Sequence, residues 1–218
     1  MKRVFGFIAR AIRFCVRPVY RALKRLRLRN RGFSLITNNC CGGVIYHDLG
    51  QQFRSPTINL SIPTDDYVVF LEHLPEALST DPQDAGVSDS GYPLGDIRFN
   101  DGQTVRIHFA HYHSFGEALD KWKTRCGRVD PDNLFVLMEA GNLVEPDVIR
   151  RFDELDFKNK MIITAPENRD LYRNATAVDV YGDSYYPGKI LALRNTGLHP
   201  GRYLDAFDYV GWLNHPEK

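Results

Sequence analysis

The uneven distribution of charge is the feature that most constrains how this chain can fold. Residues 1–31 contain 11 of the 28 Lys and Arg residues and no Asp or Glu. Residues 32–218 therefore carry 17 basic and 27 acidic residues, a net charge of −10. A length of 218 residues fits one domain with an appendage. We divide the chain into a basic leader, residues 1–31, and a single acidic domain, residues 32–218.

The leader has the pattern of an amphipathic helix. Steps of three and four residues place its apolar residues on one stripe: Val4, Phe5, Ile8, Ile12, Cys15, Val16, Val19, Leu23 and Leu26. Pro18 interrupts the pattern and is expected to kink or divide the helix. The longest apolar run, Val4–Ala9, is too short to span a bilayer. We expect this basic amphipathic helix to lie on an anionic membrane surface.

Two other interpretations of the leader remain open. The helix could dock on the acidic body of its own chain, where opposite charges attract. It could also be a nucleic-acid arm, but an acidic body would repel phosphates. The sequence therefore predicts no nucleic-acid partner.

Cysteine usage indicates a reducing compartment. The chain has four cysteines, Cys15, Cys40, Cys41 and Cys126, and no CxxC pair of the kind that holds structural zinc. No secretory signal pattern precedes them. Cys15 and Cys126 lie on helical apolar stripes and are expected to act as small hydrophobic residues.

Strand-like and helix-like segments alternate after the leader. Strands are expected at Phe33–Thr37, Thr57–Ile62, Leu134–Met138 and Met161–Ala165. A hairpin is expected around Asn100-Asp101-Gly102-Gln103, and residues 79–92 read as a loop. Helices are expected over Val44–Leu49, from the Thr64 N-cap to Pro75, from the Ser114 capping box with Glu117, from Pro146, and around Tyr203–Val210. This order predicts a layered α/β/α domain with a mainly parallel sheet and one antiparallel hairpin.

The first polar cluster follows the first expected strand. Asn38, Asn39, Gly42 and Gly43 permit unusual backbone angles and close approach of a ligand. Cys40 stands between them, just before a helix whose dipole would favour its thiolate, as a nucleophile requires. A tight turn with a buried cysteine is the structural alternative.

The second cluster contains three histidines at the end of the hairpin. His108 lies on the expected strand, while His111 and His113 lie on the turn that follows it. His108 or His111 is a candidate general base for Cys40 if the two strand ends meet. A metal site is disfavoured because no HExxH or matching carboxylate pattern is present.

A basic edge lies on the helix that follows the histidines. Lys121, Arg125 and Arg128 recur at i, i+4 and i+7 beside Trp122, and this edge could bind the phosphate of a donor. A solvated helix face is the alternative. Asp130-Pro131-Asp132 has the spacing of a DxD metal site, but it precedes a strand and its proline is typical of a turn.

An ordered set of motifs resembles a known family. The motifs are SLITNNCCGGVIY (Ser34–Tyr46), RSPT (Arg54–Thr57), Asp66-Tyr67, HFAHY (His108–Tyr112), KWKTRCGRV (Lys121–Val129) and DNLFV (Asp132–Val136). Over roughly residues 31–165 they resemble an uncharacterised bacterial family labelled exopolysaccharide or capsule biosynthesis protein. The resemblance implies an α/β fold and a role at the cytoplasmic face of the membrane. It implies no proven reaction, and Cys40, rather than Cys41, matches the family's cysteine.

Three functions are consistent with these patterns. In the first, a transferase uses Cys40 with His108 or His111 for acyl transfer to a polysaccharide or its lipid-linked precursor. In the second, a glycosyltransferase uses the same cleft without a thiol. In the third, a non-catalytic assembly protein binds saccharide there. Candidate substrate-binding residues are Asn38, Asn39, Gly42, Gly43, Tyr112, Lys121, Trp122, Arg125 and Arg128. The sequence indicates no particular cofactor.

Overall fold

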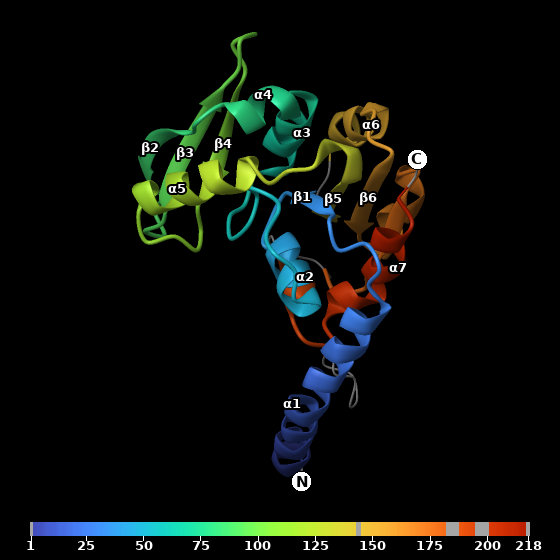
Figure 1. Cartoon of the computed structure of the whole chain (residues 1–218). Coiled ribbons are helices and arrows are strands. Elements are labelled where there is room, and N and C mark those ends of the chain that lie inside the picture. Colours follow the sequence, from blue (N-terminus) through green and yellow to red (C-terminus); the bar gives the residue numbers. More distant parts are fainter. Residues whose placement is uncertain (1, 143–144, 182–187, 195–200, 217–218) are drawn as a thin grey trace.

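Two β-sheets form the framework of the domain (Figure 1). The computed structural model describes residues 2–142, 145–181, 188–194 and 201–216, with side chains from Cys15 onward. A parallel sheet has the strand order β1-β5-β6-β7, and an antiparallel sheet has the order β2-β3-β4. The parallel strands are β1 (Ser34–Thr37), β5 (Leu134–Gly141), β6 (Asn159–Thr164) and β7 (Ala175–Ala177). The antiparallel strands are β2 (Gln83–Val87), β3 (Pro93–Arg98) and β4 (Thr104–His108).

Helices connect and cover these strands. The α-helices are α1 (Lys2–Arg27), α2 (Cys41–Leu49), α3 (Thr64–Glu72), α4 (Leu74–Ser79), α5 (Phe115–Cys126), α6 (Pro146–Glu154) and α7 (Tyr209–Asn214). Short 3-10 helices are η1 (Pro131–Asn133), η2 (Pro166–Leu171), η3 (Lys189–Leu191) and η4 (Tyr203–Ala206). Among the described residues, no helix combines the length and the apolar character needed to cross a membrane.

Alternate side chains of the parallel sheet belong to two separate cores. Val136 and Met138 of β5 face α3, α6 and the antiparallel sheet. Phe135 and Leu137 face the opposite side, where α2, η4 and α7 pack. Because successive strand residues point to opposite faces, an uninterrupted apolar strand such as β5 must be covered on both. This arrangement confirms the predicted α/β/α layering.

Several expectations about single elements need correction. Residues 57–62 do not form a strand beyond one bridge at Ser61, because Asn59 adopts a left-handed backbone with φ 63°. Residues 79–92 are not only loop: they contain β2, an exposed edge strand without apolar alternation. The helix from Thr64 starts there with no side-chain cap and ends at Glu72, and Pro75 lies in the first turn of α4, which begins at Leu74.

Other helix expectations are confirmed in part. Ser114 Oγ accepts from Glu117 N at 3.2 Å, but the Glu117 carboxylate accepts from His113 N rather than from Ser114 N. The last expected helix is divided into η4 and α7. Helix α1 runs unbroken through Pro18, so the proline does not divide it.

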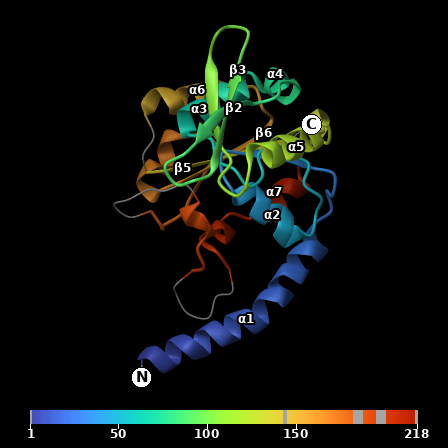
Figure 2. The same cartoon turned by 90° about the vertical axis from the view of Figure 1, so that its left-hand side faces the viewer.

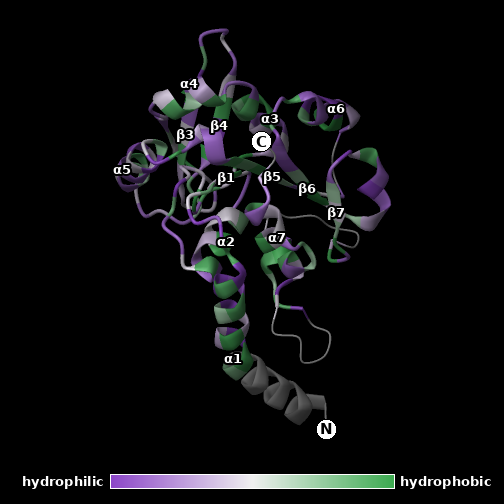
Figure 3. Cartoon of the chain, turned by 45° about the vertical axis from the view of Figure 1, so that its right-hand side comes forward, coloured by the Kyte–Doolittle hydropathy of each residue, from purple (hydrophilic) through white to green (hydrophobic). Residues whose placement is uncertain are grey.

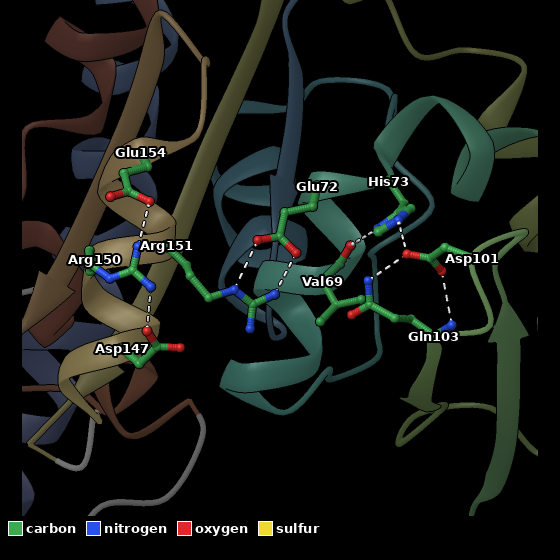
Figure 4. A network of polar contacts seen from close by, with 9 residues as sticks. All are labelled: Val69, Glu72, His73, Asp101, Gln103, Asp147, Arg150, Arg151 and Glu154. Carbon is green, nitrogen blue, oxygen red and sulfur yellow. Dashed lines mark hydrogen bonds and ion pairs between the residues drawn. The ribbon is translucent and has the colours of Figure 1, made fainter.

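Polar contacts hold α3 between the hairpin and α6 (Figure 4). Arg151 of α6 forms a two-pronged contact with Glu72, with 3.0 Å between Nε and Oε1. At the other side, His73 Nε2 lies 3.0 Å from Asp101 Oδ2 in the β3–β4 turn, and Gln103 also donates to Asp101. Exposed ion pairs of this kind stabilise little individually.

The end of α1 docks on the acidic body through its basic face. Lys24 is buried, where its ammonium contacts Asp205 and donates to Tyr209 Oη at 2.7 Å. Arg21 Nε lies 2.8 Å from Asp48 Oδ1, and Leu28 is buried in the core. The docked-leader interpretation therefore describes this part of the helix.

Replacing Lys24 should destabilise the protein far more than replacing Arg27. Lys24→Met leaves the Asp205 carboxylate buried without its cation, which should cost about 3 to 5 kcal/mol of unfolding free energy. Arg27→Met removes an exposed pair with Asp208 and should cost about 0 to 1 kcal/mol. Urea denaturation of both variants measures the difference. Equal losses would show that α1 does not depend on its buried contact.

Candidate functional site

The carboxyl ends of β1 and β5 lie at the same edge of the parallel sheet. These strands are parallel neighbours, with Thr37 opposite Leu137. The chain leaves β1 toward α2 on one face of the sheet and leaves β5 toward α6 on the other. In open α/β sheets, ligands bind outside the carboxyl ends of the strands. The polar side chains at this edge are therefore the first candidates for a site.

Glu139 lies buried at this edge and organises its surroundings. Its carboxylate accepts from Asn39 Nδ2, from Tyr181 Oη at 3.2 Å, from Gly188 N at 2.8 Å and from Ile190 N at 3.4 Å. Burial raises the pKa of Glu139 above its ordinary value, although these donors act in the opposite direction. One carboxylate thus ties β5 to the turn after β1 and to the segment beginning at Gly188.

The side chains of the two asparagines in the predicted cluster are buried and form hydrogen bonds with other groups of the protein. Asn38 pairs with the backbone of Glu139 in both directions, donating to its carbonyl at 3.0 Å and accepting from its amide at 2.9 Å. Asn39 Oδ1 accepts from Cys41 N at 2.9 Å, which satisfies one free amide at the start of α2. These contacts explain the Asn-Asn pair through the local fold.

Packing requires a glycine at position 42. A Cβ on Gly42 would lie 2.6 Å from Thr37 Oγ1, closer than Cβ atoms approach in proteins, whereas one on Gly43 would lie at a contact distance of 3.4 Å from Asn59 Oδ1. Both glycines are buried. Their small size allows α2 to approach β1 and the segment 58–62.

Cys40 is not an activated thiol in this environment. Its Sγ donates to Leu60 O at 3.7 Å, and burial together with the Glu139 charge raises its pKa to about 11. The sequence predicts that the α2 dipole favours the thiolate, whereas burial and the Glu139 charge act against it here. Cys41 is fully buried, and its pKa is raised further for the same reason.

The segment 58–62 separates Cys40 from the histidines. On one side Ile62 N donates to Asn38 O at 2.8 Å, and on the other Ser61 and His108 exchange two backbone hydrogen bonds of 2.8 Å. The His111 amide donates to Asn59 O, and its side chain is exposed. No hydrogen bond joins Cys40 to either ring in this described part of the chain.

His108 has the surroundings of a neutral, oriented imidazole. It is half-buried at the end of β4, and its Nδ1 lies 3.1 Å from Tyr92 Oη. Burial and the nearby Arg106 charge lower the pKa of His108, while Asp66 raises it by less. When Nδ1 carries the proton and donates to Tyr92, the Nε2 lone pair remains available to accept a proton.

The basic edge of α5 mainly supports the neighbouring loop. Arg125 is buried, where its guanidinium donates to Tyr112 Oη at 2.6 Å and to Ile58 O at 3.3 Å. Arg128 donates to Phe53 O at 3.3 Å, whereas Lys121 is exposed. The edge therefore splits into two residues bonded to residues 53–58 and one exposed lysine.

Two other predicted features have structural explanations. Trp122 is buried in the core, where its indole N–H donates to Thr80 O at 3.2 Å. Asp130 caps η1 by accepting from Asp132 N at 3.1 Å, so the DxD spacing belongs to a turn. Within the described part of the chain, no three His, Cys, Asp or Glu residues are placed to hold a metal ion.

Sequence comparison gives the chain its family. A family model described as a domain of unknown function, DUF1919, matches residues 11–214. The chain belongs to the DUF1919 family. This DUF1919 protein is also 36% identical to an uncharacterized protein of Haemophilus influenzae over 197 residues, which cover 90% of this chain and 91% of that protein. Neither description states an activity, so the polysaccharide role that the resemblance implies is taken up as a proposal.

Sequence reasoning missed Glu139, Tyr92 and Asn59. Glu139 did leave a signal, because it is the one acidic residue in the otherwise apolar strand Leu134–Gly141. Asn59 and Tyr92 left none, since a left-handed φ and a contact between distant residues depend on the folded chain.

The alkylation of Cys40 should require alkaline pH. With a pKa of about 11, the Cys40 thiol should react slowly with iodoacetamide at pH 7 and speed up only as pH approaches that value. Glu139→Gln should shift the profile to lower pH, because it removes a nearby negative charge. Mass spectrometry of each cysteine peptide measures the rates, with the exposed Cys15 as internal reference. Faster labelling of Cys40 than of Cys15 at pH 7 would contradict this prediction and would indicate that Cys40 is an activated nucleophile.

Proposed function

We propose that this protein is a transferase of bacterial surface-polysaccharide assembly, acting at the cytoplasmic face of the membrane. The saccharide substrate class follows from the motif resemblance to the exopolysaccharide family. The transferase assignment is supported by His108 at the end of β4, which is half-buried and whose Nδ1 lies 3.1 Å from Tyr92 Oη. Membrane location would bring the protein to a lipid-linked saccharide precursor.

The observation that carries the proposed chemistry is the contrast between Cys40 and His108. The Cys40 thiol stays protonated at neutral pH, since its pKa is raised to about 11. A lowered pKa leaves the His108 imidazole neutral, and Tyr92 fixes its ring. A neutral imidazole with one free nitrogen is suited to accept the proton of an attacking hydroxyl.

We therefore favour transfer to a saccharide hydroxyl without a thioester intermediate. In this mechanism His108 accepts the proton of the acceptor hydroxyl, and the oxygen attacks the electrophilic carbon of the donor. The bond from that carbon to the donor's leaving group breaks, and the electron pair departs with the leaving group. Glycosyl transfer fits this scheme directly, because it needs no thiol. Glu139 takes no part in the proton transfer, since its carboxylate is buried and bonded to donors of the protein.

Complementation of a strain that lacks the protein tests this proposal. Cys40→Ser should restore surface polysaccharide at normal protein level, because the thiol is not ionised in the proposed mechanism. His108→Gln should lose about 10²-fold or more of the activity, the usual contribution of a general base. His111→Gln is the matched control, since the side chain of His111 is exposed and should be replaceable.

The other outcomes identify the alternatives. Loss of acylated polymer with Cys40→Ser, and normal polymer with His108→Gln, would indicate cysteine-dependent acyl transfer instead. Normal polymer with every variant would indicate a non-catalytic assembly protein that binds saccharide. Both results are read at matched protein abundance, measured by immunoblotting.

A further inference from the structure

Helix α1 carries an apolar stripe that faces away from the protein body. Cys15 is exposed, and the exposed fractions of its neighbours on the stripe are 41% for Val16, 59% for Val19, 55% for Leu23 and 80% for Leu26. At 100° per residue, these positions share one side of the helix. Single exposed apolar residues are common on protein surfaces, but these five form a continuous row over about three turns of the helix.

The opposite side of α1 is already occupied. Arg21 and Lys24 pair with Asp48 and Asp205 of the body, and Arg27, beside the stripe, forms an exposed pair with Asp208. An ordinary surface helix buries its apolar side and exposes its charges. Here the orientation is reversed because the acidic body attracts the basic side, and the apolar side is left outside.

The path of α1 leaves this side accessible. The helix projects from the body in Figures 1 and 2, which view the molecule from directions 90° apart. Hydrophobic residues colour part of the described length of α1 green in Figure 3, beyond the layers of the domain. A broad, flat partner can therefore reach the stripe without contacting the sheets first.

We propose that the outward stripe of α1, formed by Cys15, Val16, Val19, Leu23 and Leu26, inserts into the headgroup boundary of an anionic lipid bilayer. This deepens the membrane location within the proposed function by assigning the lipid contact to the apolar side, while the basic side of residues 21–27 holds the body. Burial of apolar side chains supplies the main attraction.

Charge selects the bilayer over a second copy of the helix. The leader has 11 basic and no acidic residues, so two leaders pressed together along their stripes would repel each other. An anionic surface attracts the same charges, including the exposed Arg29 and Arg31 beyond α1.

Vesicle sedimentation of the full chain tests the assignment. Wild-type protein should bind vesicles of phosphatidylglycerol mixed with phosphatidylcholine and should bind phosphatidylcholine alone more weakly. The double variant Leu23→Gln with Leu26→Gln should lower partitioning by about tenfold or more, since two leucines no longer leave water. Glutamine is a good helix former, so α1 should persist, which circular dichroism checks.

The chain offers a matched control with the same chemistry elsewhere. Val87 and Leu171 are also exposed, at 68% and 54%, but lie on β2 and η2. Val87→Gln with Leu171→Gln should leave vesicle binding unchanged. Equal loss in both double variants, or no loss in the α1 variant, would overturn the proposal. A wild-type dimer that disappears in the α1 variant would also overturn the proposal, because it would show that a second copy of the protein covers the stripe.

A probe on Cys15 reports the orientation directly. A polarity-sensitive fluorophore attached to the exposed thiol of Cys15 should shift to shorter wavelength when anionic vesicles are added. An unchanged spectrum during vesicle binding would place the stripe in water and contradict the proposal. Neither readout involves polysaccharide, so failure here would leave the result of the His108 complementation unaffected.

Discussion

The buried carboxylate of Glu139 is the interaction on which the candidate site depends. It accepts hydrogen bonds from the turn after β1, from Tyr181 and from the amides of Gly188 and Ile190. These groups come from two parts of the chain far apart in sequence, residue 39 and residues 181–190. Since a buried carboxylate without donors is strongly unfavourable, Glu139 requires these segments to converge at the end of β5. The arrangement at the carboxyl end of β5 thus depends on charge burial as well as on strand topology.

At α1, too, a charged group is buried only together with its partners. Lys24 is buried because its ammonium contacts Asp205 and Tyr209, and this anchors a helix whose apolar side is exposed in the described part of the chain. Electrostatic attraction between the basic leader and the acidic body thereby decides which side of the helix is exposed. If the protein lies on a membrane as proposed, the exposed apolar side of α1 contacts lipid while the basic side contacts the domain.

Local patterns predicted the elements but not the contacts between them. The apolar runs of β1, β5 and β6, the Asn-Asp-Gly-Gln turn and the Ser114 cap were readable because neighbouring residues determine them. Cys40 and His108 were correctly located at strand ends, yet the sequence could not show that residues 58–62 lie between them. The Cys40 pKa, the donors of Glu139 and the docked side of α1 all depend on burial by distant segments. Edge strand β2 lacked the alternation that identifies a strand.

The pH dependence of stability tests the role of Glu139 most directly. Because burial raises the pKa of Glu139 above its ordinary value of 4.5, its contribution to folding is complete at low pH and is lost as pH rises through the folded-state value. The free energy of unfolding of the wild type, relative to Glu139→Gln, should therefore fall as pH increases above about 4.5 and then level off. Urea denaturation across that range measures it. A difference that rises with pH would show that the donors outweigh burial and would contradict this account.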